Sequence, residues 1–62
     1  MFILVNDIAG TARAINLSHV EQVYREGHDS CTVCFQDVVV HVALPFGMFV
    51  SKLQEAGLLE KE

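Results

Sequence analysis

Residues 31–44 of this chain are rich in apolar and strand-forming side chains, with few polar residues among them. Because successive residues of a β-strand point to opposite faces, this stretch predicts two strands joined by a turn near Gln36 and Asp37. The turn contains no glycine, which disfavours a type I′ turn. One face of the predicted hairpin carries Cys31, Val33, Phe35, Val38, Val40, Val42 and Leu44. The opposite face carries Thr32, Cys34, Gln36, Val39, His41 and Ala43. Both faces are largely apolar, so both are expected to need cover.

Three further strands are predicted upstream, over residues 1–5, 11–17 and 21–25. The residues between the first two strands include Asn6, Asp7 and Gly10, which accept turn geometries. Residues 27–30 form the next predicted turn. Between residues 17 and 23 the apolar spacing changes to three, which predicts a single helical turn with Ser18 as its local cap.

The last part of the chain has helical periodicity. Pro45 ends the preceding strand and suits the first turn of a helix. Apolar residues then fall at positions 46, 49, 50, 53 and 56, which predicts a helix over residues 46–56. Gly57 is expected to end it in a left-handed cap, with Leu58 folding back onto Leu53.

These elements predict an α+β fold: an antiparallel five-stranded meander, SH3-like and curled into a partly open barrel, with one C-terminal helix. Residues 1–62 are expected to form one small domain. A single helix covers only one face of a sheet, and 52% of the residues are hydrophobic. The second face is therefore expected to contact another copy of the chain. The residues predicted at this interface are Ile3, Tyr24, Cys34, Val39, His41, Ala43 and Met48.

Charge and hydropathy limit the range of partners. The formal net charge is −4, and Arg13, Arg25 and Lys52 are too scattered to form a basic stripe. A strong phosphate-binding surface needs clustered basic residues, so a nucleic-acid partner is disfavoured. No apolar run reaches the roughly 20 residues of a membrane span, and the first residues lack the pattern of a signal peptide. We expect a cytoplasmic protein with reduced thiols.

Cys31 and Cys34 form a C-x-x-C motif, and with His28 and His41 they could supply four zinc ligands. Residues three apart on a strand point to opposite faces, which argues against that site. A redox role requires the motif at a helix N-terminus, and the predicted context is a strand. We therefore predict Cys31 as a small core residue and Cys34 as a surface or interface residue.

No catalytic, cofactor-binding or metal-binding residue is predicted, and we do not expect an enzyme. His41 is expected to bond a neighbouring side chain rather than act as a ligand or base. The four glycines are dispersed, which excludes a glycine-rich phosphate loop.

Several positions resemble a family of small bacterial proteins that are encoded with flagellar genes and linked to swarming motility. The resemblance lies in Gly10, Ile15-Asn16-Leu17, Val20, Val23, Thr32-Val33, Phe35-Gln36-Asp37 and the apolar helix. The chain departs from the family at Val38, where the last hairpin normally carries glycine, and at Leu44-Pro45-Phe46-Gly47 before the helix. The resemblance implies a bacterial or phage origin and a non-catalytic role.

The sequence thus predicts a non-enzymatic interaction module that forms a homo-oligomer, with another protein as a possible further partner. Two alternatives stay open. One is a regulator that contacts nucleic acid as an oligomer, in which Arg13, Arg25 and Lys52 converge across copies. The other is a small zinc-stabilised domain.

Overall fold

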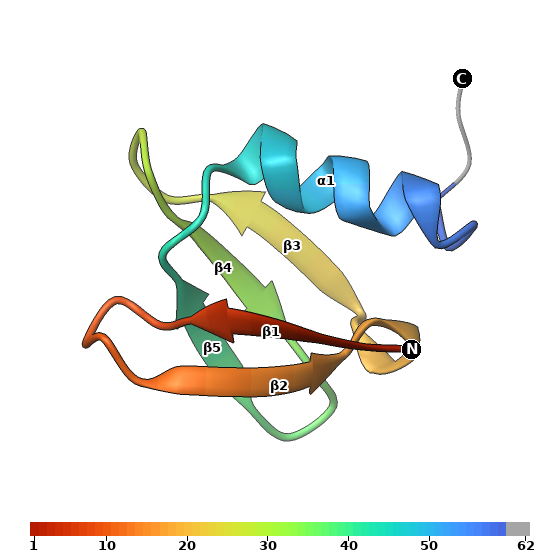
Figure 1. The fold of residues 1–62 in the computed structure, drawn as a ribbon, viewed down its shortest axis with the longest axis horizontal. Coiled ribbons are helices and arrows are strands. Elements are labelled where there is room, and N and C mark those ends of the chain that lie inside the picture. Colours follow the sequence, from red (N-terminus) through yellow and green to blue (C-terminus); the bar gives the residue numbers. More distant parts are fainter. Residues whose placement is uncertain (60–62) are drawn as a thin grey trace.

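A computed structural model describes residues 1–59 of the chain (Figure 1). The order of its elements is strand, strand, 3₁₀ turn, three strands and a helix, with bounds β1 Phe2–Asn6, β2 Ala12–Asn16, η1 Leu17–His19, β3 Gln22–Arg25, β4 Cys31–Cys34, β5 Val39–Val42 and α1 Phe46–Glu55. The α+β class, the five antiparallel strands and the C-terminal helix are confirmed.

The five strands form two sheets, so the prediction of a single five-stranded meander is wrong. β1 pairs with β2, and β3, β4 and β5 form a separate three-stranded sheet. η1 lies between β2 and β3 and redirects the chain, so these consecutive strands do not pair. The two sheets meet instead through an isolated bridge between Asp7 and Val42. Two hydrogen bonds flank it, from Ile8 N to His41 O at 3.0 Å and from Ala43 N to Asn6 O at 2.8 Å.

The short turn η1 is capped by Asn16 rather than by Ser18. The Asn16 side-chain oxygen accepts a hydrogen bond from Ser18 N at 3.0 Å. Asn16 is the last residue of β2 and keeps an extended backbone, which is the usual geometry of an N-cap. The side chain that stops the strand therefore also starts the turn.

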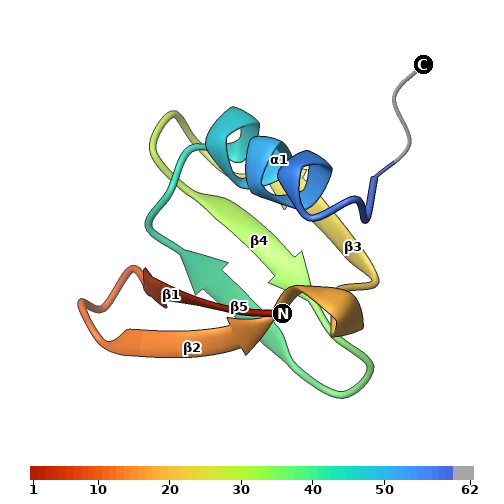
Figure 2. The ribbon, with the colours of Figure 1, turned by 45° about the vertical axis from the view of Figure 1, so that its right-hand side comes forward.

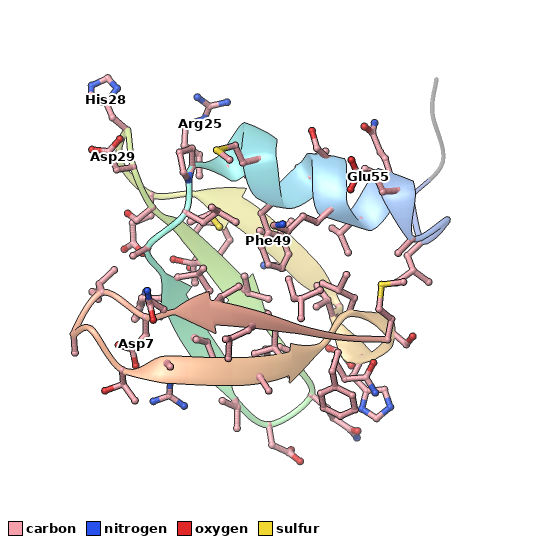
Figure 3. The ribbon with its side chains drawn as sticks, viewed as in Figure 1. Asp7, Arg25, His28, Asp29, Phe49 and Glu55 are labelled. Carbon is pink, nitrogen blue, oxygen red and sulfur yellow. The ribbon has the colours of Figure 1, made fainter. Side chains whose placement is uncertain are left out.

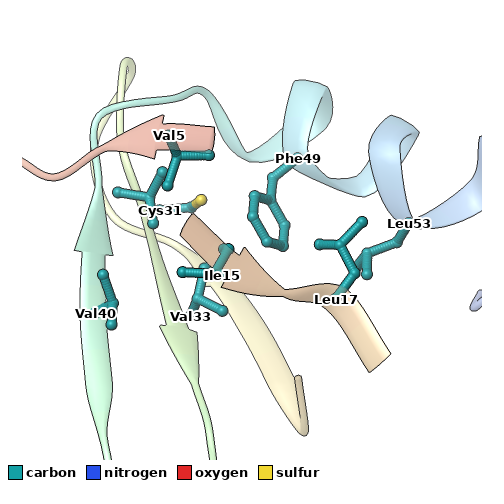
Figure 4. Packing of buried hydrophobic residues seen from close by; sticks show 9 residues of the cluster. Val5, Ile15, Leu17, Cys31, Val33, Val40, Phe49 and Leu53 are labelled. Carbon is teal, nitrogen blue, oxygen red and sulfur yellow. The ribbon is translucent and has the colours of Figure 1, made fainter. Parts of the chain in front are cut away.

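Both α1 and the β1–β2 hairpin pack on the inner face of the three-stranded sheet (Figure 2). Phe49 points from α1 into the centre of this core, toward Ile15 and Leu17 (Figure 4). It is fully buried, as are Val33 and Val42 on the sheet. The buried core consists of Val5, Ile15, Leu17, Cys31, Val33, Val40, Val42, Phe49 and Leu53. Of the predicted inward-facing residues of the hairpin, those within β4 and β5 are confirmed in this core.

The helix has the predicted boundaries to within one residue. Pro45 stands at its N-cap, and Gly57 adopts a left-handed backbone with φ of 72°. Leu58 N donates to Leu53 O at 2.9 Å, and Gly57 N donates to Gln54 O at 3.0 Å. These two bonds are those of a Schellman motif, so the predicted end of the helix is confirmed.

Replacing Phe49 by alanine should unfold much of the protein at 25 °C. Loss of a buried phenylalanine costs about 3–5 kcal/mol. A domain of 62 residues has about 3–9 kcal/mol in total, so little stability would remain. Thermal and urea unfolding measure the change. The matched control is Met48→Ala on the same helix, where the side chain is 55% exposed. An equal loss of unfolding free energy in both variants would contradict this description of the core.

Candidate functional site

The outer face of the β3–β4–β5 sheet points away from the core and is the candidate site. Its residues lie in rows across the sheet, because β4 pairs with both neighbours in register. One row contains Gln22, Cys34 and Val39, and the next contains Tyr24, Thr32 and His41. Glu26 follows on the β3 side and Ala43 on the β5 side, so the outer face consists of Gln22, Tyr24, Glu26, Thr32, Cys34, Val39, His41 and Ala43.

Five of the seven predicted interface residues come together on this outer face. They are Tyr24, Cys34, Val39, His41 and Ala43. Val39 is 54% exposed and Tyr24 is 48% exposed, so both present apolar surface to the outside.

The other two predicted interface residues lie elsewhere. Ile3 pairs with Ile15 in the hairpin and packs against the core. Met48 is exposed on α1, which covers the opposite side of the sheet. Neither residue joins the outer face of the same copy.

A polar cluster lies at the centre of the outer face. Thr32 Oγ1 donates a hydrogen bond to the Glu26 carboxylate. His41 Nδ1 lies 2.9 Å from Glu26 Oε1 and 3.2 Å from Thr32 Oγ1. Since an ionised carboxylate only accepts hydrogen bonds, the proton of this contact belongs on Nδ1. These contacts bury Thr32 completely. The prediction that His41 bonds a neighbouring side chain is confirmed.

The arrangement of this cluster differs from that of a catalytic triad. In a triad the histidine uses one ring nitrogen for the nucleophilic hydroxyl and the other for the carboxylate. Here the Thr32 hydroxyl and the Glu26 carboxylate both approach the same nitrogen of His41. The hydroxyl donates to the carboxylate and is not activated by the ring. The cluster satisfies polar groups on a sheet surface, which suits a binding face more than a nucleophilic one.

Hydrogen bonding sets the ionisation of Glu26. The hydrogen bond from Thr32, and after it the bond from His41, lower the pKa of Glu26 below its ordinary value of 4.5. Sequence reasoning missed both Glu26 and Thr32 as members of this cluster. The pairing of Thr32 with His41 follows from the hairpin register. No strand register predicts the position of Glu26, because this residue lies beyond the end of β3 and its side chain reaches diagonally across two strands.

A second polar cluster holds the β1–β2 turn. Asp7 Oδ1 accepts hydrogen bonds from Ala9 N at 3.0 Å and Thr11 N at 2.9 Å. Arg13 Nε donates to Asp7 Oδ2 at 2.8 Å. The bond from Arg13 is the main cause that lowers the pKa of the Asp7 carboxyl, and the turn amides add to it. This cluster fixes the turn beside the bridge between the sheets, so its role is structural.

The four residues of the zinc alternative are not brought together. Cys31 is buried in the core, where burial raises the pKa of its thiol, while Cys34 is half-buried on the outer face. His28 lies at the tip of the β3–β4 turn, pointing away from the sheet (Figure 3). Across the part of the chain that the structure describes, no three His, Cys, Asp or Glu side chains are placed to hold a metal ion.

The basic residues of the nucleic-acid alternative lie on different elements. Arg13 is paired with Asp7 on the hairpin. The Arg25 guanidinium lies over the Phe46 ring, 5.2 Å from its centroid, and Lys52 lies on α1. One copy of the chain therefore presents no joint basic surface from these three residues.

Comparison with known proteins gives no relative for this chain. It matches no protein-family model, no curated protein and no solved structure at a significant level. Among residues 1–59, no helix is both long enough and apolar enough to cross a membrane.

Replacing Thr32 by valine should raise the pKa of Glu26 toward 4.5, because the largest cause of its lowering is removed. Valine keeps the shape of the side chain, so the sheet should stay folded. Carbon-detected NMR titration of the Glu26 carboxyl measures the shift. Ser30→Ala is the control, since the Ser30 hydroxyl donates to the backbone carbonyl of Glu26 and not to its carboxylate. An unchanged Glu26 pKa in Thr32→Val would refute the cluster.

Asp7→Asn should lower the melting temperature at pH 7, with an effect that disappears in acid. The folded pKa of Asp7 is depressed below its ordinary value of 3.8. Its stabilising contribution is therefore present above pH 3.8 and is lost as the pH falls through the folded pKa. Thermal melts of both proteins between pH 2 and pH 7 test this. Asp29→Asn, in the exposed β3–β4 turn, should match the wild type throughout. A difference that persists at pH 2 would contradict the role of the Asp7 charge.

Proposed function

We propose that this protein is a non-enzymatic interaction module that self-associates through the outer face of its β3–β4–β5 sheet. The observation that carries the proposal is that the helix and the hairpin cover one face of the three-stranded sheet and leave the other face exposed. α1 and the β1–β2 hairpin both pack on the inner face, and the described residues leave Tyr24 and Val39 exposed on the outer one. A contiguous apolar patch on a protein surface is typical of an interaction site.

The chemistry of the outer face supports a protein partner. The central polar atoms Glu26 Oε1, Thr32 Oγ1 and His41 Nδ1 already bond one another, so these three atoms can be covered without losing hydrogen bonds. The apolar and half-buried residues Tyr24, Cys34 and Val39 surround them. A second copy offers the same surface, which makes a symmetric contact possible.

The finer description of the fold belongs to the same proposal. The bridge between Asp7 and Val42 links β1 to β5, which supports an SH3-like, partly open barrel. Within residues 1–59, no further strand pairs with the outer sides of β2 and β3. We place the protein in the cytoplasm of a bacterium or in a phage, with a non-catalytic role. The resemblance in sequence supports this part of the proposal.

Analytical ultracentrifugation over the micromolar range tests self-association, and Val39→Asp tests the surface. A charge buried without a partner at the contact should weaken association about tenfold or more. Leu4→Asp is the matched control, because Leu4 is 75% exposed on the β1–β2 hairpin. We expect the control to keep the wild-type mass. A wild-type protein that stays a folded monomer at all concentrations would contradict the proposed function. Equal weakening of association by Val39→Asp and Leu4→Asp would show that the outer face is not the site.

A further inference from the structure

The pair formed by Glu26 and His41 lies at the centre of the outer face and is still half open to solvent. His41 Nδ1 lies 2.9 Å from Glu26 Oε1, and the exposed fractions of the two side chains are 46% for His41 and 52% for Glu26. A second copy seated on this face would therefore cover surface of both side chains. Because burial of an unpaired charge costs far more than burial of a paired one, the charge state of the pair affects such a contact.

Glu26 supplies a fixed negative charge to this pair. The hydrogen bond from Thr32, and after it the bond from His41, hold the pKa of Glu26 below 4.5, so its carboxylate is ionised at neutral pH. While the His41 ring is neutral, the pair carries one uncompensated negative charge. Once the ring is protonated, the two charges cancel within the pair.

The groups of the sheet that face His41 leave Glu26 as its charged neighbour. On β4, Thr32 lies opposite the ring and Cys34 lies diagonal to it, and Tyr24 follows on β3. Phenols and thiols ordinarily ionise at higher pH than histidine. Protonation in the histidine range therefore changes the charge of the ring without changing that of these neighbours.

Charged groups from other elements have their own places. The Asp7 carboxylate, beside the bridge to β5, is paired with Arg13 at 2.8 Å. His28 and Asp29 lie at the tip of the β3–β4 turn (Figure 3). The helix α1 packs on the opposite face of the sheet. Glu26 is thus the charged group that bonds the ring.

We propose that self-association through the outer face takes up protons, because the form that associates carries His41 protonated and paired with the Glu26 carboxylate. This inference rests on the proposed function and adds its regulation by pH. The contact then buries a pair whose charges cancel, whereas a neutral ring would leave a lone carboxylate in the contact. Burial of an ion pair has its own cost, but removing one partner of a buried pair costs more.

The direction of the pH effect follows from the proton uptake. A contact that favours the protonated ring strengthens as the pH falls through the range in which histidine titrates, and it weakens as the pH rises. The charge of Glu26 stays constant over this range, since its pKa lies below 4.5. With one proton taken up by each copy, the association constant of a symmetric dimer changes by at most about a hundredfold per pH unit.

Sedimentation equilibrium of the wild-type protein at pH 8 and pH 6 tests the direction. The dissociation constant should be about tenfold or more lower at pH 6. His28→Gln is the matched control, because it removes the same change in net charge from an exposed turn without altering the pair. This variant should keep the wild-type pH dependence. An equal loss of pH dependence in His28→Gln and His41→Gln would overturn the inference, because net charge alone would then explain the effect.

Replacing either member of the pair should change the pH dependence in a different way. Glu26→Gln keeps an acceptor oxygen but no charge, so protonation of His41 adds a lone positive charge to the contact. This variant should therefore associate more tightly at pH 8 than at pH 6. His41→Gln takes up no proton and should show at both pH values the weak association of the wild type at pH 8. Far-UV circular dichroism checks the fold of each variant. Retention of the wild-type pH dependence in His41→Gln would overturn the inference.

Dilution calorimetry counts the protons directly. The heat of dissociation at pH 6.5 is compared in two buffers of different ionisation enthalpy, and the difference gives the number of protons released. Wild type and His28→Gln should release protons on dissociation, and His41→Gln should release none. A wild-type heat that is the same in both buffers, after correction for their ionisation, would contradict the proton uptake.

The outcomes separate this inference from the proposed function. A wild-type protein that self-associates equally at pH 6 and pH 8 overturns the proton uptake and leaves the proposed function in place. One that stays monomeric at both pH values contradicts the proposed function and the proton uptake with it. Association that depends on pH but is weakened equally by Val39→Asp and Leu4→Asp would show that the pair does not act through an outer-face contact.

Discussion

Burial of Phe49 against the inner face of the three-stranded sheet is the interaction on which the rest of the structure depends. The nine apolar residues that are buried among residues 1–59 form one cluster, to which the hairpin, the sheet and the helix each contribute. A chain of this length has apolar material for one core only. Because the helix and the hairpin both pack on the inner face, no element within residues 1–59 remains to cover the outer face. The uncovered face therefore follows from the small number of elements within these residues.

Local patterns in the sequence were sufficient to identify the elements. The helical spacing after Pro45 and the glycine at position 57 located α1 and its cap, and alternation located the inward residues of β4 and β5. The pairing of the two sheets could not be found in this way. The bridge from Asp7 to Val42 joins residues far apart in the sequence, and alternation states which face a residue occupies but not which strand lies beside it.

The candidate site was also predictable only in part. Residues of the outer face followed from alternation, and the row of Thr32 with His41 followed from the hairpin. The placement of Ile3 in the hairpin could not be inferred, since an apolar residue on a strand fits either face equally well. Glu26 was missed because its role comes from a long side chain that crosses strands. Its carboxylate accepts the hydrogen bond of Thr32, which is fully buried.

Net charge and local charge act at different ranges when two copies meet. Each copy has a formal charge of −4, so two copies repel one another at a distance in low salt. At physiological ionic strength charges separated by more than about 8 Å are largely screened, and the residues in contact decide whether a complex forms. On the outer face, through which we propose that the protein self-associates, the contacting residues would be apolar side chains and polar groups that already bond one another.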